Sequence, residues 1–240
     1  MDLVVFQKGF NYAQDGRGNR LIYHIRGCNL HCPWCSNPEG MDFSETGRIS
    51  AEELVEEAVR SKPLFFDGGG VTFTGGECTC RFDALKEALA RLRERNIGTA
   101  IETNGTSPRL PEIFPLVDEL IMDCKHYDSA IHREVTGLGN EQILANLAAA
   151  AKQHPDLLIR IPLIGGFNAG EDDGVHFVEL FRAIGAQSAR IELLLYHEYG
   201  KEKWRQLGKE YTVRDAFVSE ETRKQLEKRL LDSGFQVVRT

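Results

Sequence analysis

Segments typical of strands and of helices alternate about six times along these 240 residues. Short apolar runs are typical of buried strands, and apolar residues at a spacing of three or four are typical of helices. We expect strands at residues 21–25, 71–74, 99–103, 120–124, 157–163, 189–195 and 235–238. We expect helices from residue 50, from about 83, near 111, from about 140, over 172–184 and from about 219 to 231.

This alternation predicts an α/β fold, because parallel strands need long crossover connections that are usually helices. Six units are fewer than the eight of a closed barrel and favour an incomplete (β/α)6 TIM-like barrel. The sequence has no linker or low-complexity tract, so we expect a single domain over residues 1–240. In such folds the active site lies at the carboxyl ends of the strands.

Composition argues against two classes of partner. The formal net charge of −7 disfavours nucleic acid, whose binding proteins present a basic surface. No apolar run reaches the roughly 20 residues that a membrane-spanning helix needs. We therefore expect neither a nucleic-acid nor a membrane partner.

The strongest chemical signal is a C-x3-C-x2-C loop made by Cys28, Cys32 and Cys35. Three thiolates can bind three irons of a 4Fe–4S cluster and leave the fourth iron for a small molecule, whereas an electron-carrying cluster normally has a fourth cysteine. The alternative is a structural zinc site completed by His24 or His31, but no second C-x2-C pair follows. Residues 1–10 have no apolar signal-peptide core, so we expect a reducing, cytoplasmic compartment rather than disulfides.

Polar residues follow each of the expected strands. They are Cys28, Glu77, Thr103 and Asn104, Asp123 to Lys125, Arg160 and His197. Gly75 and Gly76 would let a ligand approach the backbone, and the carboxylate of Glu77 suits an ammonium group. Arg160 suits bidentate contact with a carboxylate, although a plain salt bridge is its alternative. Together these groups predict a nucleotide that carries an amino acid.

The cysteine loop, the Gly75-Gly76-Glu77 turn and the six-unit pattern resemble the radical S-adenosylmethionine (SAM) superfamily. Four further segments resemble its glycyl-radical-enzyme activating enzymes: ETNG from Glu102, DCKH from Asp123, HREVTG from His132 and YHEYGKEKW from Tyr196. The resemblance implies an oxidoreductase that reductively cleaves SAM at a 4Fe–4S cluster. The resulting 5′-deoxyadenosyl radical would abstract hydrogen from a backbone glycine of a partner such as pyruvate formate-lyase.

The resemblance also implies roles for individual residues. Cys28, Cys32 and Cys35 would bind the cluster, Trp34 would lie near the adenine, and Gly75, Gly76 and Glu77 would bind the methionine end of SAM. Thr103, Asn104, Lys125, Arg160 and His197 would contact its carboxylate, ribose or sulfonium surroundings. Glu102 and Asp123 would help to bind a monovalent cation. Asp15, in a turn expected at the barrel mouth, would meet the partner's glycyl loop. A flavodoxin- or ferredoxin-type electron donor and a monomeric state are also implied.

Some features depart from the family pattern. Cys78 stands after Glu77 where many members have proline, and Glu102 is a longer carboxylate than the family's aspartate. Cys78, Cys80 and Cys124 have no implied role, and we expect buried structural thiols. Residues 36–70 contain no cysteine, so the ferredoxin-like insert of many activating enzymes is not expected. Two alternatives are a radical SAM enzyme acting on a small molecule and a zinc- or cluster-stabilised binding protein.

Overall fold

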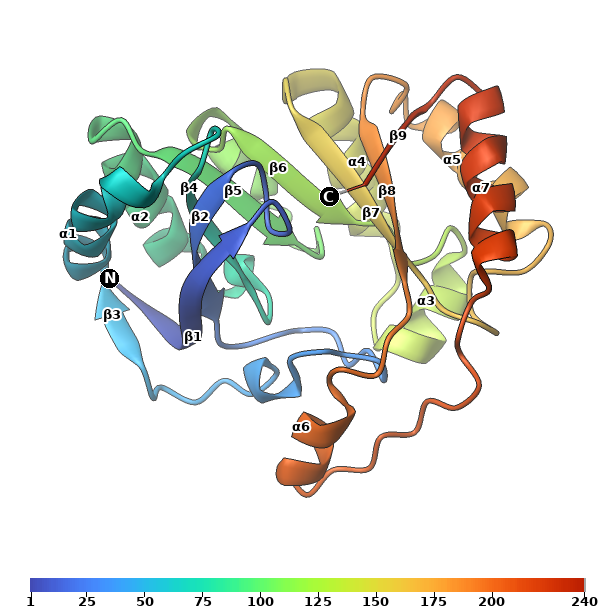
Figure 1. The fold of residues 1–240 in the computed structure, drawn as a ribbon, viewed down its shortest axis with the longest axis horizontal. Coiled ribbons are helices and arrows are strands. Elements are labelled where there is room, and N and C mark those ends of the chain that lie inside the picture. The colour runs from blue at the N-terminus through green and yellow to red at the C-terminus, as the bar shows by residue number, and fades with distance from the viewer. Residues whose placement is uncertain (240) are drawn as a thin grey trace.

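A computed structural model describes residues 1–239. Its nine strands form one curved sheet in the order β3-β1-β2-β4-β5-β6-β7-β8-β9, with most helices around the outside (Figure 1). The strands are β1 Asp2–Tyr12, β2 Asn19–Ile25, β3 Arg48–Ser50, β4 Gly70–Gly75, β5 Gly98–Thr103, β6 Glu119–Asp123, β7 Leu157–Leu163, β8 Arg190–Leu195 and β9 Gln236–Val238. The α-helices are α1 Ala51–Ser61, α2 Phe82–Glu94, α3 Ser129–Thr136, α4 Glu141–Gln153, α5 Asp173–Ala183, α6 Lys201–Gln206 and α7 Glu220–Asp232. Short 3-10 helices are η1 Pro38–Gly40, η2 Lys62–Leu64, η3 Cys78–Arg81 and η4 Leu110–Leu116.

The predicted incomplete barrel is confirmed. Strands β2, β4, β5, β6, β7 and β8 pair in parallel, each with the next, and β9 adds a parallel strand beside β8. Because all six lie in chain order and point the same way, their carboxyl ends meet at one rim of the sheet. The sheet ends at β3 on one side and at β9 on the other. In the described part of the chain β1 and β9 do not pair with each other, so the barrel is not closed.

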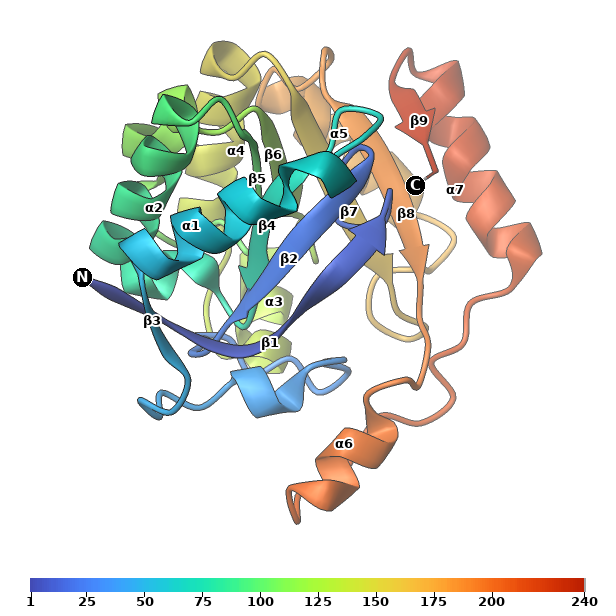
Figure 2. The same cartoon turned by 60° about the vertical axis from the view of Figure 1, so that its left-hand side comes forward.

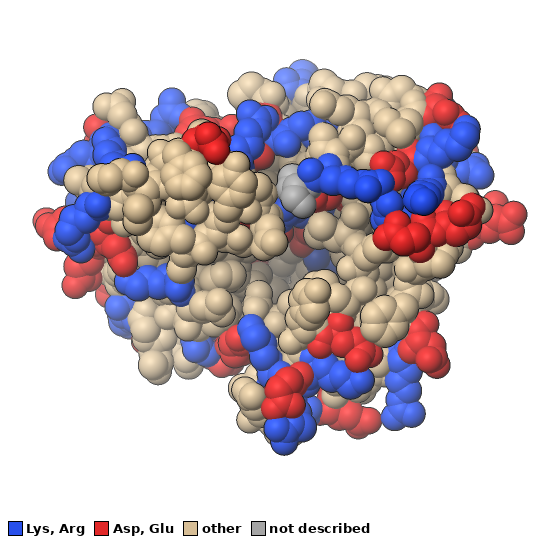
Figure 3. All heavy atoms as spheres, in the orientation of Figure 1, with Lys and Arg blue, Asp and Glu red and all other residues tan. Residues whose placement is uncertain are grey.

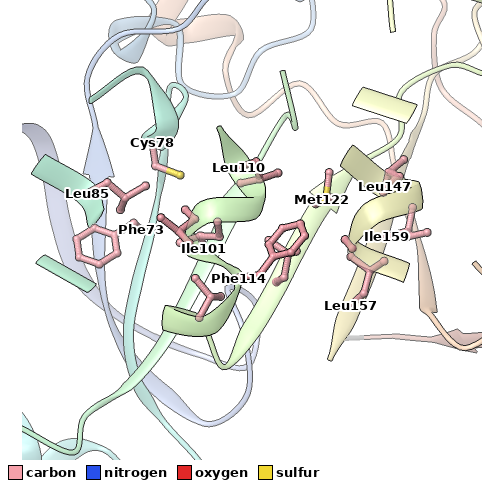
Figure 4. Close-up of a cluster of buried hydrophobic side chains, with 14 of the residues drawn as sticks. Phe73, Cys78, Leu85, Ile101, Leu110, Phe114, Met122, Leu147, Leu157 and Ile159 are labelled. Carbon is pink, nitrogen blue, oxygen red and sulfur yellow. The ribbon is translucent and has the colours of Figure 1, made fainter. Parts of the chain in front are cut away.

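Local sequence signals explain where the main helices begin. Ser50 caps α1 through a capping box with Glu53, as the sequence predicted. Ser219 caps α7 by accepting a hydrogen bond from the amide of Thr222. The apolar faces of α1, α2 and α4 pack on the sheet in one buried cluster, part of which Figure 4 shows around Phe73 and Ile101.

Four elements escaped the sequence prediction. Strand β1 pairs antiparallel with β2, and β3 pairs antiparallel with the first residues of β1. Most residues of β1 beyond Phe6 are exposed, so it lacks the apolar run of a buried strand. Helices α3 and α6 are only two turns long or shorter, which leaves too few positions for a periodic signal.

The turn between β1 and β2 does not lie at the barrel mouth, contrary to our expectation. It joins the amino-terminal end of β2 and crosses the concave face of the sheet from there. Thr72 Oγ1 donates to the carbonyl of Asp15 at 2.7 Å, and the amide of Arg17 donates to Glu119 at 2.8 Å. Arg160 donates to the carbonyl of Gln14. The turn therefore fills the barrel interior beneath the strand ends, because Thr72, Glu119 and Arg160 come from three different strands.

Candidate active site

A cavity of about 240 Å³ opens at the carboxyl ends of the parallel strands. It brings together most of the residues that the sequence predicted for SAM and its cluster. Its predicted lining residues are Cys28, Cys32, Trp34, Cys35, Gly75, Gly76, Glu102, Thr103, Asn104, Asp123, Lys125 and His197. Ile164, Leu194 and Tyr196 add an apolar wall that the sequence analysis missed. The cavity combines thiols, charged groups and apolar surface, as a site for a charged nucleotide requires.

The cysteine loop is held from outside by α6. Trp204 Nε1 donates to the carbonyl of Cys35 at 2.9 Å, and Lys203 donates to Asn37 and Glu39 at 2.8 and 2.7 Å. On the other side, the amide of His31 donates to the carbonyl of Thr136 at the end of α3. The segments YHEYGKEKW and HREVTG thus support the loop. The sequence analysis singled out these motifs but not Lys203 or Trp204.

Gly75 and Gly76 bring the end of β4 against the cysteine loop. Gly75 has a φ of +113°, a conformation that favours glycine. A Cβ atom on Gly76 would meet the backbone carbonyls of Gly40 and Gly27. The first effect of a side chain at Gly76 would therefore be to displace the cysteine loop.

Glu77 does not line the cavity. Its carboxylate is buried and accepts hydrogen bonds from Thr103 Oγ1 and the amide of Asn104 at 2.6 Å, and from the amide and hydroxyl of Thr79 at 2.9 and 2.5 Å. Burial raises the pKa of Glu77, although the bonds from Thr103 and Thr79 oppose that shift. In this structure Glu77 fixes Thr103 and Asn104 in the cavity wall, and its contact with SAM stays a prediction.

Arg160 also lies behind the cavity rather than in its wall. Its side chain is 4% exposed, and it donates to Glu102 at 2.5 Å and to Glu192 at 2.8 Å. Burial alone would raise the pKa of Glu102, but the charge of Arg160 lowers it below its ordinary value. Arg160 therefore reaches the cavity wall through Glu102, which does line the cavity, and its own contact with SAM stays a prediction.

Lys125 supplies a charged group to the cavity. Its Nζ donates to Asp123 at 2.5 Å. Burial alone would lower the pKa of Lys125, but the negative charge of Asp123 raises it above its ordinary value. Lys125 therefore remains a cation at neutral pH and can attract a carboxylate.

A second cavity, of about 540 Å³, adjoins the first and shares Ser36, Asn37 and His197 with it. Asp15 and His24 line it from the concave face of the sheet. Asn11 Nδ2 donates to Asp15 at 2.6 Å. Burial and the nearby charge of Glu102 raise the pKa of Asp15. Asp15 therefore faces a space that adjoins the first cavity.

Comparisons with known proteins agree with this geometry. The model of the radical SAM superfamily matches residues 22–178. The chain is 31% identical to the choline trimethylamine-lyase activating enzyme of Oleidesulfovibrio alaskensis over 83% of this chain and 85% of that protein. It is 30% identical to the pyruvate formate-lyase 1-activating enzyme of Escherichia coli over 83% of this chain and 82% of that protein. The chain belongs to the activating enzymes of the radical SAM superfamily. A solved domain of a pyruvate-formate lyase-activating enzyme from Bacteroides vulgatus superposes with a TM-score of 0.59 and 29% identity, over 71% of this chain and 98% of that domain.

Membership in the radical SAM superfamily implies a 4Fe–4S cluster and SAM, and the cysteine loop fits the cluster. All three thiols line one cavity, and none is in a disulfide. Within residues 1–239, no three His, Cys, Asp or Glu side chains converge on a point as a single metal ion requires. Burial raises the pKa of Cys32 to about 12, so bound metal would have to displace a proton.

The other cysteines of this radical SAM protein do not line that cavity. Cys78 and Cys124 are buried in the main apolar cluster, and Figure 4 shows Cys78 beside Phe73 and Leu85. Cys80 is only partly buried. Cys78 and Cys124 are therefore buried, as we expected for structural thiols.

No helix in the described part of the chain is long and apolar enough to cross a membrane.

Proposed function

We propose that this enzyme activates a glycyl radical enzyme by removing a hydrogen atom from a backbone glycine of that partner. The observation that carries the proposal is the pair of adjoining cavities, which share Ser36, Asn37 and His197. One contains the cysteines and the predicted SAM residues, and the other contains Asp15 and leads away from them. A SAM enzyme with a small substrate would need only an extension of the first cavity, whereas a folded partner needs a second entrance.

Each group of residues in and behind the first cavity has its own role. When bound, the cluster and SAM supply the 5′-deoxyadenosyl radical that takes the hydrogen atom. Lys125 attracts the SAM carboxylate, Thr103 and Asn104 offer hydrogen bonds to its polar groups, and Trp34 and Ile164 exclude water beside the adenine. His197 lies where the two cavities meet and contacts the ribose side. Glu77 and Arg160 hold this wall from behind.

A monovalent cation beside the SAM carboxylate is part of the proposal. Glu102 and Asp123 both line the first cavity, at the ends of the neighbouring strands β5 and β6. Carboxylate oxygens are the ligands that hard cations prefer. The ion would offset part of the negative charge of two protein carboxylates and one SAM carboxylate.

The remaining features of the proposal concern partners and organisation. We assign to Asp15 the contact with the partner's glycyl loop, and to a flavodoxin- or ferredoxin-type protein the supply of electrons. We propose one radical SAM domain over residues 1–240, working as a monomer in the cytoplasm. Residues 36–70 form η1, β3, α1 and η2, which supports the compact form without a ferredoxin-like insert.

The test uses anaerobically reconstituted protein, reduced and supplied with SAM. Pyruvate formate-lyase and choline trimethylamine-lyase serve as candidate partners, because the relatives' names point to them. The expected result is SAM cleavage together with the doublet of a glycyl radical in electron paramagnetic resonance. The Asp15→Ala variant should bind SAM and cleave it slowly without partner, yet give no doublet. SAM cleavage that never yields a doublet with either partner would contradict the proposal and favour a small-molecule substrate.

A further inference from the structure

Strand β1 has an unpaired edge over more than half of its length. On one side it pairs with β2 from Val5 to Tyr12. On the other side β3 pairs only with Asp2–Val4, and the amide of Val5 donates to Gly47 at 2.9 Å. Beyond that point no other strand of residues 1–239 pairs with this edge, and Figure 2 shows β1 at the open side of the sheet. Natural proteins usually protect such edges, because they can pair with another chain.

This edge borders the second cavity. Gln7, Gly9 and Asn11 line that cavity together with Asp15 and His24. Cross-strand pairing places Gly9 opposite Ile22 and Gln7 opposite His24, and both of these partners line the same cavity. The concave face of β1 is thus one wall of the space that joins the SAM cavity. Figure 3 shows the molecule hollowed between the uncharged surface over β1 and α6 below it.

Gly9 marks a point where another backbone can come close. A Cβ atom on Gly9 would have no neighbouring atom within 4 Å. A glycine inside a strand weakens that strand and often marks a close approach of another backbone or a ligand. Since nothing in the described chain occupies the space at Gly9, the approaching backbone would belong to another molecule.

We propose that the partner's glycine-bearing segment binds in an extended conformation along the free edge of β1, from Phe6 to Tyr12, in line with β3. This inference rests on the proposed function and names how the partner is bound. The reaction takes hydrogen from a backbone carbon, so the partner must present backbone rather than a side chain. Strand addition holds a backbone through main-chain hydrogen bonds. It also leaves Asp15, across the cavity, free to fix the position of the glycine.

The opposite face of β1 provides a matched control. Lys8 lies between Gln7 and Gly9 but donates to Glu57 of α1 at 2.6 Å, on the convex side. Gly9→Val would place a side chain on the concave face of β1, in the second cavity that the partner's segment has to enter, and valine suits a strand position. Lys8→Val would remove only a partly exposed ion pair, which contributes little to stability. Both variants should fold, bind SAM and cleave it without a partner as the wild type does.

The experiment compares these two variants with whichever of the two candidate partners gives the stronger doublet. We expect Gly9→Val to lose at least ten-fold in radical yield and Lys8→Val to keep the wild-type yield. In hydrogen–deuterium exchange, the amides of residues 6–12 should become protected when that partner and SAM are added to the wild type. A full doublet from Gly9→Val, or protection confined to other segments, would overturn strand addition and leave the activating function standing. A wild type that gives no doublet at all would overturn both.

Discussion

The guanidinium of Arg160 donates a 2.5 Å hydrogen bond to the carboxylate of Glu102, and this ion pair links the two cavities. Glu102 lines the cavity predicted for SAM. Arg160 donates in addition to the carbonyl of Gln14, next to Asp15 in the second cavity. Glu192 completes the charge balance of Arg160 from the neighbouring strand β8. The position of the turn that carries Asp15 therefore depends on the same side chain that orients Glu102.

Replacing Arg160 should destabilise the protein before it affects any ligand. Arg160→Gln leaves Glu102 and Glu192 buried without their cation, which typically costs about 3–5 kcal/mol. Chemical denaturation of the protein would measure this loss. Adding Glu192→Gln should restore part of it, because one buried charge is removed. A variant of unchanged stability that only binds SAM more weakly would instead indicate a direct contact.

Asp15 should destabilise the native state at neutral pH. Burial and Glu102 raise its native pKa, so the native carboxyl holds its proton more tightly than the unfolded one. Stability therefore falls as pH rises from the ordinary aspartate pKa of about 4 through the raised native value. Asp15→Asn should increase the free energy of unfolding at pH 7, by about 1.4 kcal/mol for each unit of the shift. The increase should vanish below pH 4 in denaturation curves.

Asp128 provides the opposite case as a control. It caps α3 by accepting hydrogen bonds from the amides of Ala130 and Ile131, which lower its pKa. Its stabilisation is therefore present at neutral pH and is lost as pH falls through the lowered native value. Asp128→Ala should lower stability at pH 7 and lose that effect in acid. If Asp15→Asn and Asp128→Ala changed stability in the same direction at pH 7, the burial of Asp15 would be refuted.

The sequence could predict the parallel strands and the residues at their carboxyl ends. Each buried strand has its own apolar run, and parallel pairing in chain order brings these ends to one rim. This is why Cys28, Thr103, Asp123 and His197 meet in one cavity. The resemblance to a known family supplied the chemistry of that cavity.

The sequence could not predict which polar side chains form hydrogen bonds or ion pairs with other groups of the protein. Glu77 follows strand β4 and Arg160 lies within strand β7, yet their partners come from positions distant along the chain. The sequence could not predict the free edge of β1 either, because the exposed residues of this strand show no alternation of apolar and polar side chains. Such pairings depend on tertiary packing rather than on local pattern.

Trp204 should protect the cluster loop through its hydrogen bond to the carbonyl of Cys35. Trp204→Phe keeps a ring but loses the Nε1 donor, a change of about 1 kcal/mol. We expect reconstituted Trp204→Phe to release iron to a chelator several-fold faster than the wild type. Tyr199→Phe, at an exposed ring, serves as the control and should not change the rate. Equal rates for Trp204→Phe and the wild type would show that α6 does not stabilise the loop.

Five of the six cysteines should separate into two groups when each is replaced by alanine. Reconstituted wild type should contain about four irons per chain, and Cys28→Ala, Cys32→Ala and Cys35→Ala should each lose the cluster spectrum and SAM cleavage. Cys78→Ala and Cys124→Ala should keep both, because these thiols lie in the apolar core away from the cavity. Each should lower the free energy of unfolding by about 1 kcal/mol through lost burial.

Iron content, visible absorption and denaturation measured on the same samples distinguish loss of the cluster from loss of the fold. If Cys78→Ala lost its iron while remaining as stable as the wild type, a fourth protein ligand would have to be assigned, and the iron open to SAM would be lost with it.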